Sequence, residues 1–174
     1  LSDADQDTMK VWWDLMRSFF EQDQETKNKY SYRTETNLGY SIVGAENVDP
    51  TAPKDMKESF NYNNTRMPDD LWPSSIKGFK ETALQSIDVA DRLTLDILTK
   101  FDTILDSGTT LVDAHIEPYN TTRVIHYPAM KPTLDRQMRI GEHSDYGTIT
   151  LLWQIDSVPG LEDEELDGKW HTVP

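Results

Sequence analysis

The sequence predicts an α+β fold in which helices come first and a β-sheet follows. Two observations carry this prediction. Over roughly the first 110 residues, apolar side chains recur at three- and four-residue steps, as on one face of a helix. From Arg123 onward the period changes to two, as in a strand with one buried face. The length of 174 residues suits one domain. We therefore expect a mainly helical scaffold over residues 1–110 and the sheet over residues 111–174.

The first predicted helix begins after Ser2, which can cap it together with Asp3 and Asp5, and runs to about Phe20. The polar stretch that follows predicts an exposed continuation of this helix to near Tyr30. The apolar stripe of the helix comprises Met9, Trp12, Trp13, Leu15, Met16, Phe19 and Phe20.

Two segments between the helices have weaker signals. Residues 36–46 contain Gly39 and Gly44 and have the composition of a loop or an edge strand. Asp55, Lys57 and Glu58 then form a charged run, which by itself predicts a surface turn.

A long helix is predicted over residues 76–105. Pro73 precedes it, Ser74 or Ser75 could cap it, and Gly108 would end it. Its charged face is interpreted as solvated. The apolar positions of the other face are Phe79, Ala83, Ile87, Ala90, Leu93, Ile97, Phe101 and Leu105.

A strand is predicted over residues 123–128, where Pro128 would stop it. Alternation places Arg123, Ile125 and Tyr127 on one face, and Val124 and His126 on the other. His126 is therefore interpreted as a surface or packing residue.

The most informative stretch is RIGEHSDYGTITLLWQ, residues 139–154. His143 and Asp145 are two residues apart, so on an extended backbone both side chains point to one face. One imidazole and one carboxylate are two thirds of the facial triad that holds non-haem Fe(II). A single His-x-Asp triplet arises easily by chance in a chain with 4 His and many Asp, so its context decides. Residues 148–154 are β-branched and apolar and predict a buried strand.

That context resembles the iron- and 2-oxoglutarate-dependent oxygenases of the isopenicillin N synthase-like superfamily. The family run Gly-x-His-x-Asp-Tyr/Phe-Gly, followed by Thr-Leu-Leu and a Gln, matches GEHSDYGTITLLWQ nearly position for position. Three upstream stretches resemble family segments that form scaffold around the active site. They are Phe19-Phe20, Gly39-Tyr40, and the charged run with Phe60 and Trp72-Pro73.

The resemblance implies a jelly roll (double-stranded β-helix), partial here, with N-terminal helices before it and the long helix along it. It implies that His143 and Asp145 bind Fe(II), and that the Tyr127 hydroxyl reaches the distal carboxylate of the co-substrate 2-oxoglutarate. Ile125 replaces an asparagine that is common in plant members, so that co-substrate contact differs. The implied reaction oxidises a small-molecule substrate with O2, with ascorbate as an accessory reductant.

The family pattern also extends past both ends of this chain. It begins before Leu1, and after KWHTVP it continues with the strands that carry the second metal histidine and an Arg-x-Ser. We therefore expect this single domain to be an oxygenase fragment that is inactive alone and able to associate through open strand edges. His171 falls inside the Trp170-x-x-Val173 pattern and is not expected to be a ligand; His115 has no partner spacing.

Three functions remain open at this point. The first is the oxygenase, including members that do not use 2-oxoglutarate. The second is a catalytically silent jelly-roll binding module. The third is a hydrolase with Zn²⁺ on His143 and Asp145, which lacks a His-Glu-x-x-His or cysteine-based site.

Composition excludes other classes. The chain has 17 basic and 31 acidic residues and a net charge of −14, which disfavours nucleic acids and anionic membrane surfaces. It has no cysteine, so no disulfide or thiolate metal site is possible. Neither a membrane-spanning run nor a secretory signal is visible, and the default location is cytoplasmic. Nothing in the sequence identifies the substrate.

Overall fold

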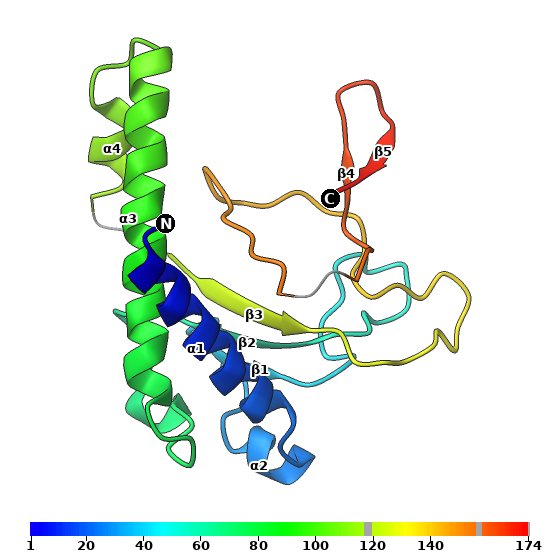
Figure 1. The fold of residues 1–174 in the computed structure, drawn as a ribbon. Helices are drawn as coiled ribbons and strands as arrows, with labels where there is room; N and C mark the ends of the chain where they lie inside the picture. The colour runs from blue at the N-terminus through cyan, green and yellow to red at the C-terminus, as the bar shows by residue number, and fades with distance from the viewer. Residues whose placement is uncertain (117–119, 156–157, 174) are drawn as a thin grey trace.

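The computed structural model describes residues 1–116, 120–155 and 158–173 and has an α+β architecture, as predicted (Figure 1). The predicted order, with the sheet after the helices, is wrong, because the main sheet takes strands from within residues 39–62, inside the segment predicted to be a helical scaffold. A three-stranded antiparallel sheet has the order β1-β2-β3, with β1 at Gly39–Ser41, β2 at Glu58–Tyr62 and β3 at Thr122–His126. Helices α1 (Asp3–Phe20) and α3 (Phe79–Ile104) pack against each other. The short elements are α2 (Gln24–Asn28), the 3-10 helix Asp69–Leu71, α4 (Thr110–Ala114) and a hairpin of β4 (Glu162–Glu164) with β5 (Trp170–Thr172).

Helix α1 begins where the sequence predicts. The Ser2 hydroxyl accepts a hydrogen bond from the Asp5 backbone N–H (3.2 Å), and the Asp5 carboxylate accepts one from the Ser2 N–H (3.1 Å), so both ends of a capping box are present. The predicted continuation to Tyr30 is wrong. The helix ends at Phe20, and Asp23 starts α2 by accepting from the Thr26 N–H at 2.8 Å.

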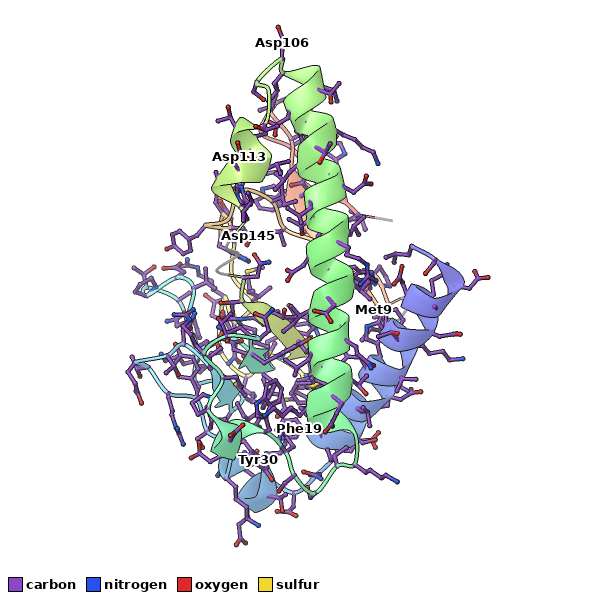
Figure 2. The ribbon with its side chains drawn as sticks, turned by 90° about the vertical axis from the view of Figure 1, so that its left-hand side faces the viewer. Met9, Phe19, Tyr30, Asp106, Asp113 and Asp145 are labelled. Atoms are coloured by element: carbon purple, nitrogen blue, oxygen red, sulfur yellow. The ribbon has the colours of Figure 1, made fainter. Side chains whose placement is uncertain are left out.

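The core lies between these helices and one face of the sheet. Aromatic rings from each layer meet edge to face: the Trp12 ring lies 5.1 Å from that of Tyr62 and 4.9 Å from that of Phe79, and Phe19 lies 5.1 Å from Phe60. Figure 2 shows the lower turns of α3 beside α1, with Phe19 at this junction. The predicted stripe of α1 is therefore core.

Strand β2 is the centre of the sheet, and all five of its residues are buried. The predicted surface turn at Asp55, Lys57 and Glu58 is therefore wrong, since each of these residues is only 3% exposed. Their charges are compensated inside the protein, for example by the 2.6 Å ion pair between Lys57 and Glu46. Of the loop or edge strand predicted over residues 36–46, three residues form the edge strand β1.

The long helix was predicted to begin at Ile76, but α3 begins three residues later, after Gly78. Gly78 has φ of 80°, a left-handed conformation, and neither Ser74 nor Ser75 caps the helix. The apolar stripe is buried at its start, at Phe79, Ala83 and Ile87. At the far end, where α4 lies beside α3, Phe101, Ile104 and Leu105 are exposed (Figure 1).

The second half of the chain contains less regular structure than predicted. Strand β3 confirms the strand over residues 123–128, but residues 148–154 form no strand. Their side chains still alternate: Ile149, Leu151 and Trp153 are half-buried, and the residues between them are exposed. No strand in the described ranges pairs with this segment, which explains the missing ladder. The observed sheets are two small antiparallel ones, so the partial jelly roll stays a prediction, and Pro174 of the KWHTVP segment lies outside the described residues.

The helices give no sign of a membrane span: within the described ranges, none has both the length and the apolar character to cross a bilayer.

Candidate metal and co-substrate site

The structure brings His143 and Asp145 together. The distance between His143 Nε2 and Asp145 Oδ1 is 3.4 Å, and both side chains are exposed. The spacing of two residues thus produces the expected convergence, although the segment is irregular rather than a strand. A nitrogen and a carboxylate oxygen this close could both contact one divalent ion, so the donor set fits Fe(II).

Each of the two side chains is oriented by a second contact. His143 Nδ1 lies 2.9 Å from the Gly141 carbonyl oxygen, which can only accept, so Nδ1 carries a proton and Nε2 is the ring nitrogen that faces Asp145. Asp145 Oδ2 accepts a hydrogen bond from the Thr150 hydroxyl at 2.6 Å, which leaves Oδ1 on the histidine side. Contacts of this kind orient metal ligands in known sites.

A third protein ligand does not accompany this pair in the described part of the chain. The described residues do contain one group of three side chains that could hold a metal, but it lies on the β4–β5 hairpin. It consists of Glu165, Asp167 and His171. All three are exposed, and the Asp167 carboxylate already pairs with Lys169 Nζ at 2.5 Å. Exposed acidic groups of this kind are common without a metal, so we do not assign a second centre to the hairpin.

Tyr127 lies one residue beyond β3. Burial raises the pKa of its hydroxyl, and the negative charge of Asp55 adds to this effect. The hydroxyl forms no hydrogen bond with any residue that the structure describes, and Tyr127 is 39% exposed. It is therefore a protonated donor without a protein acceptor among these residues. No hydrogen bond or ion pair joins Tyr127 to the metal pair among these residues, so its place in the same site stays a prediction.

The other histidines have structural partners. His126 Nδ1 is 2.7 Å from Glu58 Oε1, and the imidazole packs on the Phe20 ring, which confirms its packing role. His115, which has no other metal-ligand residue at a suitable spacing in the sequence, has a hydrogen-bond partner instead: its Nε2 lies 2.9 Å from the Thr148 hydroxyl.

Sequence reasoning missed a buried centre around Glu58. Its carboxylate accepts hydrogen bonds from Lys27 Nζ (2.7 Å) and the Tyr40 hydroxyl, in addition to His126. Burial alone would raise the pKa of Glu58, but these three hydrogen bonds outweigh burial and lower it. A signal was available in the sequence: Glu58 is two residues from Phe60, so a strand that buries Phe60 also directs Glu58 to the buried face.

A second charged cluster lies on the other side of β2. Glu46 accepts from Lys57 Nζ at 2.6 Å, from Arg123 at 2.9 Å and from the Ser59 hydroxyl at 3.0 Å. These partners lower the pKa of Glu46 against the opposing effect of burial. Asp55 Oδ2 is buried there without a hydrogen-bond partner, 3.9 Å from Lys57 Nζ. Polar groups therefore line the face of the sheet that also carries Tyr127.

Comparison with known proteins identifies relatives over most of the chain. Residues 2–80 match the family described as non-haem dioxygenase in morphine synthesis N-terminal. The 2-oxoglutarate-Fe(II) type oxidoreductase ppzD of Metarhizium rileyi is 32% identical over 171 residues, which cover 87% of this chain and 48% of that protein. The 2-oxoglutarate-dependent dioxygenase htyE of Aspergillus rugulosus is 32% identical over 177 residues, covering 91% of this chain and 54% of that protein.

Solved structures show the same relationship. A full-length Neurospora crassa protein in complex with alpha-KG superposes with a TM-score of 0.81 at 30% identity, over 95% of this chain and 55% of that one. A 2OG-Fe(II) oxygenase family protein of Caulobacter crescentus gives 0.78 at 26% identity, over 97% and 58%. The chain spans about half the length of the curated relatives that it matches. Across that half, the chain matches the 2-oxoglutarate- and Fe(II)-dependent dioxygenases in both sequence and fold.

Proposed function

We propose that this chain carries the metal and co-substrate part of an oxygenase that uses Fe(II), O2 and 2-oxoglutarate to oxidise a small molecule. The observation that carries the proposal is the 3.4 Å approach of His143 Nε2 and Asp145 Oδ1, with each side chain oriented by a second contact. The names of the similar proteins support the choice of iron and 2-oxoglutarate over zinc.

The residues of this chain would each have a definite task. His143 and Asp145 would hold Fe(II), which supplies oxidation by O2 coupled to decarboxylation of 2-oxoglutarate when it is bound. The Gly141 carbonyl keeps the proton on His143 Nδ1, and Thr150 holds Asp145. The Tyr127 hydroxyl is protonated at neutral pH, as in an ordinary tyrosine, and its pKa is raised further, so it could donate to the distal carboxylate of 2-oxoglutarate.

The substrate is proposed only as a class, a small molecule that undergoes hydroxylation, desaturation or ring closure. Similar proteins include a proline hydroxylase, buaE of Petromyces alliaceus, and a validamycin A dioxygenase of Streptomyces hygroscopicus. The Neurospora crassa protein is known in complex with thymine. These compounds share little chemistry, so the family does not specify the substrate. A hollow of about 540 Å³ between α1 and Trp153 includes none of the candidate site residues and does not specify it either.

Binding of Mn(II), a redox-silent substitute for Fe(II), tests the proposal. The free aqua ion is titrated by electron paramagnetic resonance against the wild-type chain and the variants His143→Ala and Asp145→Ala. Each variant should lose binding, because it removes one of the two protein donors that the described residues bring together. Ser144→Ala is the matched control between the ligands, and His171→Ala tests the hairpin group; both should bind as the wild type does. If His143→Ala binds Mn(II) with wild-type affinity, the assignment is wrong.

A further inference from the structure

Tyr127 lies at a position that the sheet itself does not hold. The β2–β3 ladder ends at the pair Glu58 and His126, so Tyr127 follows the last paired residue. Pro128 comes next and has no N–H with which to extend the ladder. Residues past the end of a ladder fray unless side chains fix them. The orientation of the Tyr127 hydroxyl therefore depends on its immediate neighbours.

His126 provides such a fixed point. Its Nδ1 lies 2.7 Å from Glu58 Oε1, and its ring centroid is 5.3 Å from that of Phe20. The acceptor is itself immobile, because the Glu58 side chain is only 4% exposed and also accepts from Lys27 and Tyr40. The imidazole is thus attached to the most constrained group of the sheet, at the last residue of the ladder.

The side chains of His126 and Tyr127 point to opposite faces, since the two residues are neighbours along an extended backbone. Holding His126 against Glu58 therefore fixes how the backbone is rotated where Tyr127 projects to the other face. On the C-terminal side of Tyr127, Arg139 donates to the Pro128 carbonyl at 3.2 Å. This contact comes from the stretch 139–154 that contains His143 and Asp145, so Tyr127 is held on both sides. We propose that His126 is a positioning residue that sets the orientation of Tyr127 through its hydrogen bond to Glu58. Its consequence for 2-oxoglutarate rests on the proposed function.

The first test needs no ligand. The 174-residue chain is labelled with 3-fluorotyrosine, and the ¹⁹F resonance of Tyr127 is assigned with Tyr127→Phe. His126→Ala should shift and broaden this resonance. His126→Asn should restore it, because the asparagine amide can donate to Glu58 from nearly the position of Nδ1. His171→Ala is the control for loss of a half-exposed histidine. Apart from Tyr40, which shares Glu58, the other tyrosine resonances should not move.

The second test measures binding of 2-oxoglutarate by calorimetry in the presence of Mn(II). His126→Ala should weaken 2-oxoglutarate about tenfold and leave Mn(II) affinity unchanged, and His126→Asn should stay within about twofold of wild type. An unchanged Tyr127 resonance in His126→Ala, equal disturbance by both substitutions, or a general change of the tyrosine spectrum would overturn the inference. If the wild type binds no 2-oxoglutarate, the proposed function fails while the ¹⁹F result still judges His126.

Discussion

Replacing Glu58 by glutamine should destabilise the fold strongly, because it removes one charge of a buried ion pair. The side chains of Lys27 and Glu58 are 7% and 4% exposed, and their charged atoms are 2.7 Å apart. Glutamine keeps the shape and one acceptor but leaves the ammonium of Lys27 buried with only the Phe20 carbonyl as a strong partner. Breaking a buried pair in this way costs about 3 kcal/mol or more.

The assay is urea denaturation at pH 7, followed by circular dichroism and tryptophan fluorescence. Asp96→Asn is the matched control, since it breaks the exposed Lys100–Asp96 pair and should cost less than about 0.5 kcal/mol. The double variant Lys27→Met with Glu58→Gln should be more stable than Glu58→Gln alone, because no uncompensated charge remains. If Glu58→Gln costs no more than Asp96→Asn, the buried pair does not support the sheet.

The same variant should change the acid stability. The pKa of Glu58 is below its ordinary value of 4.5 in the folded protein, so its contribution is present above about pH 4.5 and is lost as the pH falls through the folded pKa. The stability difference between wild type and Glu58→Gln should therefore shrink as the pH falls from about 4.5 through the lowered pKa of Glu58. A difference that stays constant over this range would show that the charge of Glu58 is not responsible.

Three further outcomes are expected. Tyr127→Phe should raise the 2-oxoglutarate concentration needed for half-saturation about tenfold with little change in Mn(II) affinity; an unchanged requirement removes Tyr127 from the site. Ser2→Ala should cost about 1 kcal/mol in urea denaturation through loss of the α1 cap, and no loss would mean that the first turn does not contribute to stability. The 174-residue chain with Fe(II) and ascorbate should not decarboxylate 2-oxoglutarate, because among the described residues only His143 and Asp145 come together as protein ligands; robust turnover would show that the chain supplies a third ligand.

The helices show what sequence alone can predict. The cap of α1 depends on residues three apart, and its stripe depends on a period of about 3.6 residues, so both could be predicted from short windows. The start of α3 was misplaced because Ser74 and Ser75 have good capping side chains, whereas the observed start depends on a left-handed Gly78. Local propensity ranks such alternatives but does not choose between them when tertiary packing sets the boundary.

The charged residues of β2 show what a short window misses. Lys27 and Glu58 are 31 positions apart, and Glu46 and Arg123 are 77 apart. A charged side chain is normally exposed unless it is paired, and pairing over these separations depends on the fold. The charged run before Phe60 therefore predicted a surface turn, although it lies in and beside the central strand.

Residues 139–154, which contain His143 and Asp145, have one feature that a short window predicts and one that depends on the fold. The convergence of His143 and Asp145 follows from a spacing of two residues, and it survives although no strand forms there. The strand predicted over residues 148–154 also needs a second segment, because the hydrogen bonds of a strand are made to a neighbouring strand. Ile149 and Trp153 keep the alternating burial of a strand without such a partner among the described residues. The sequence therefore encodes the ligand pair and the apolar face locally, while the ladder that would hold them rigid, and the distance from the pair to Tyr127, depend on contacts outside this segment.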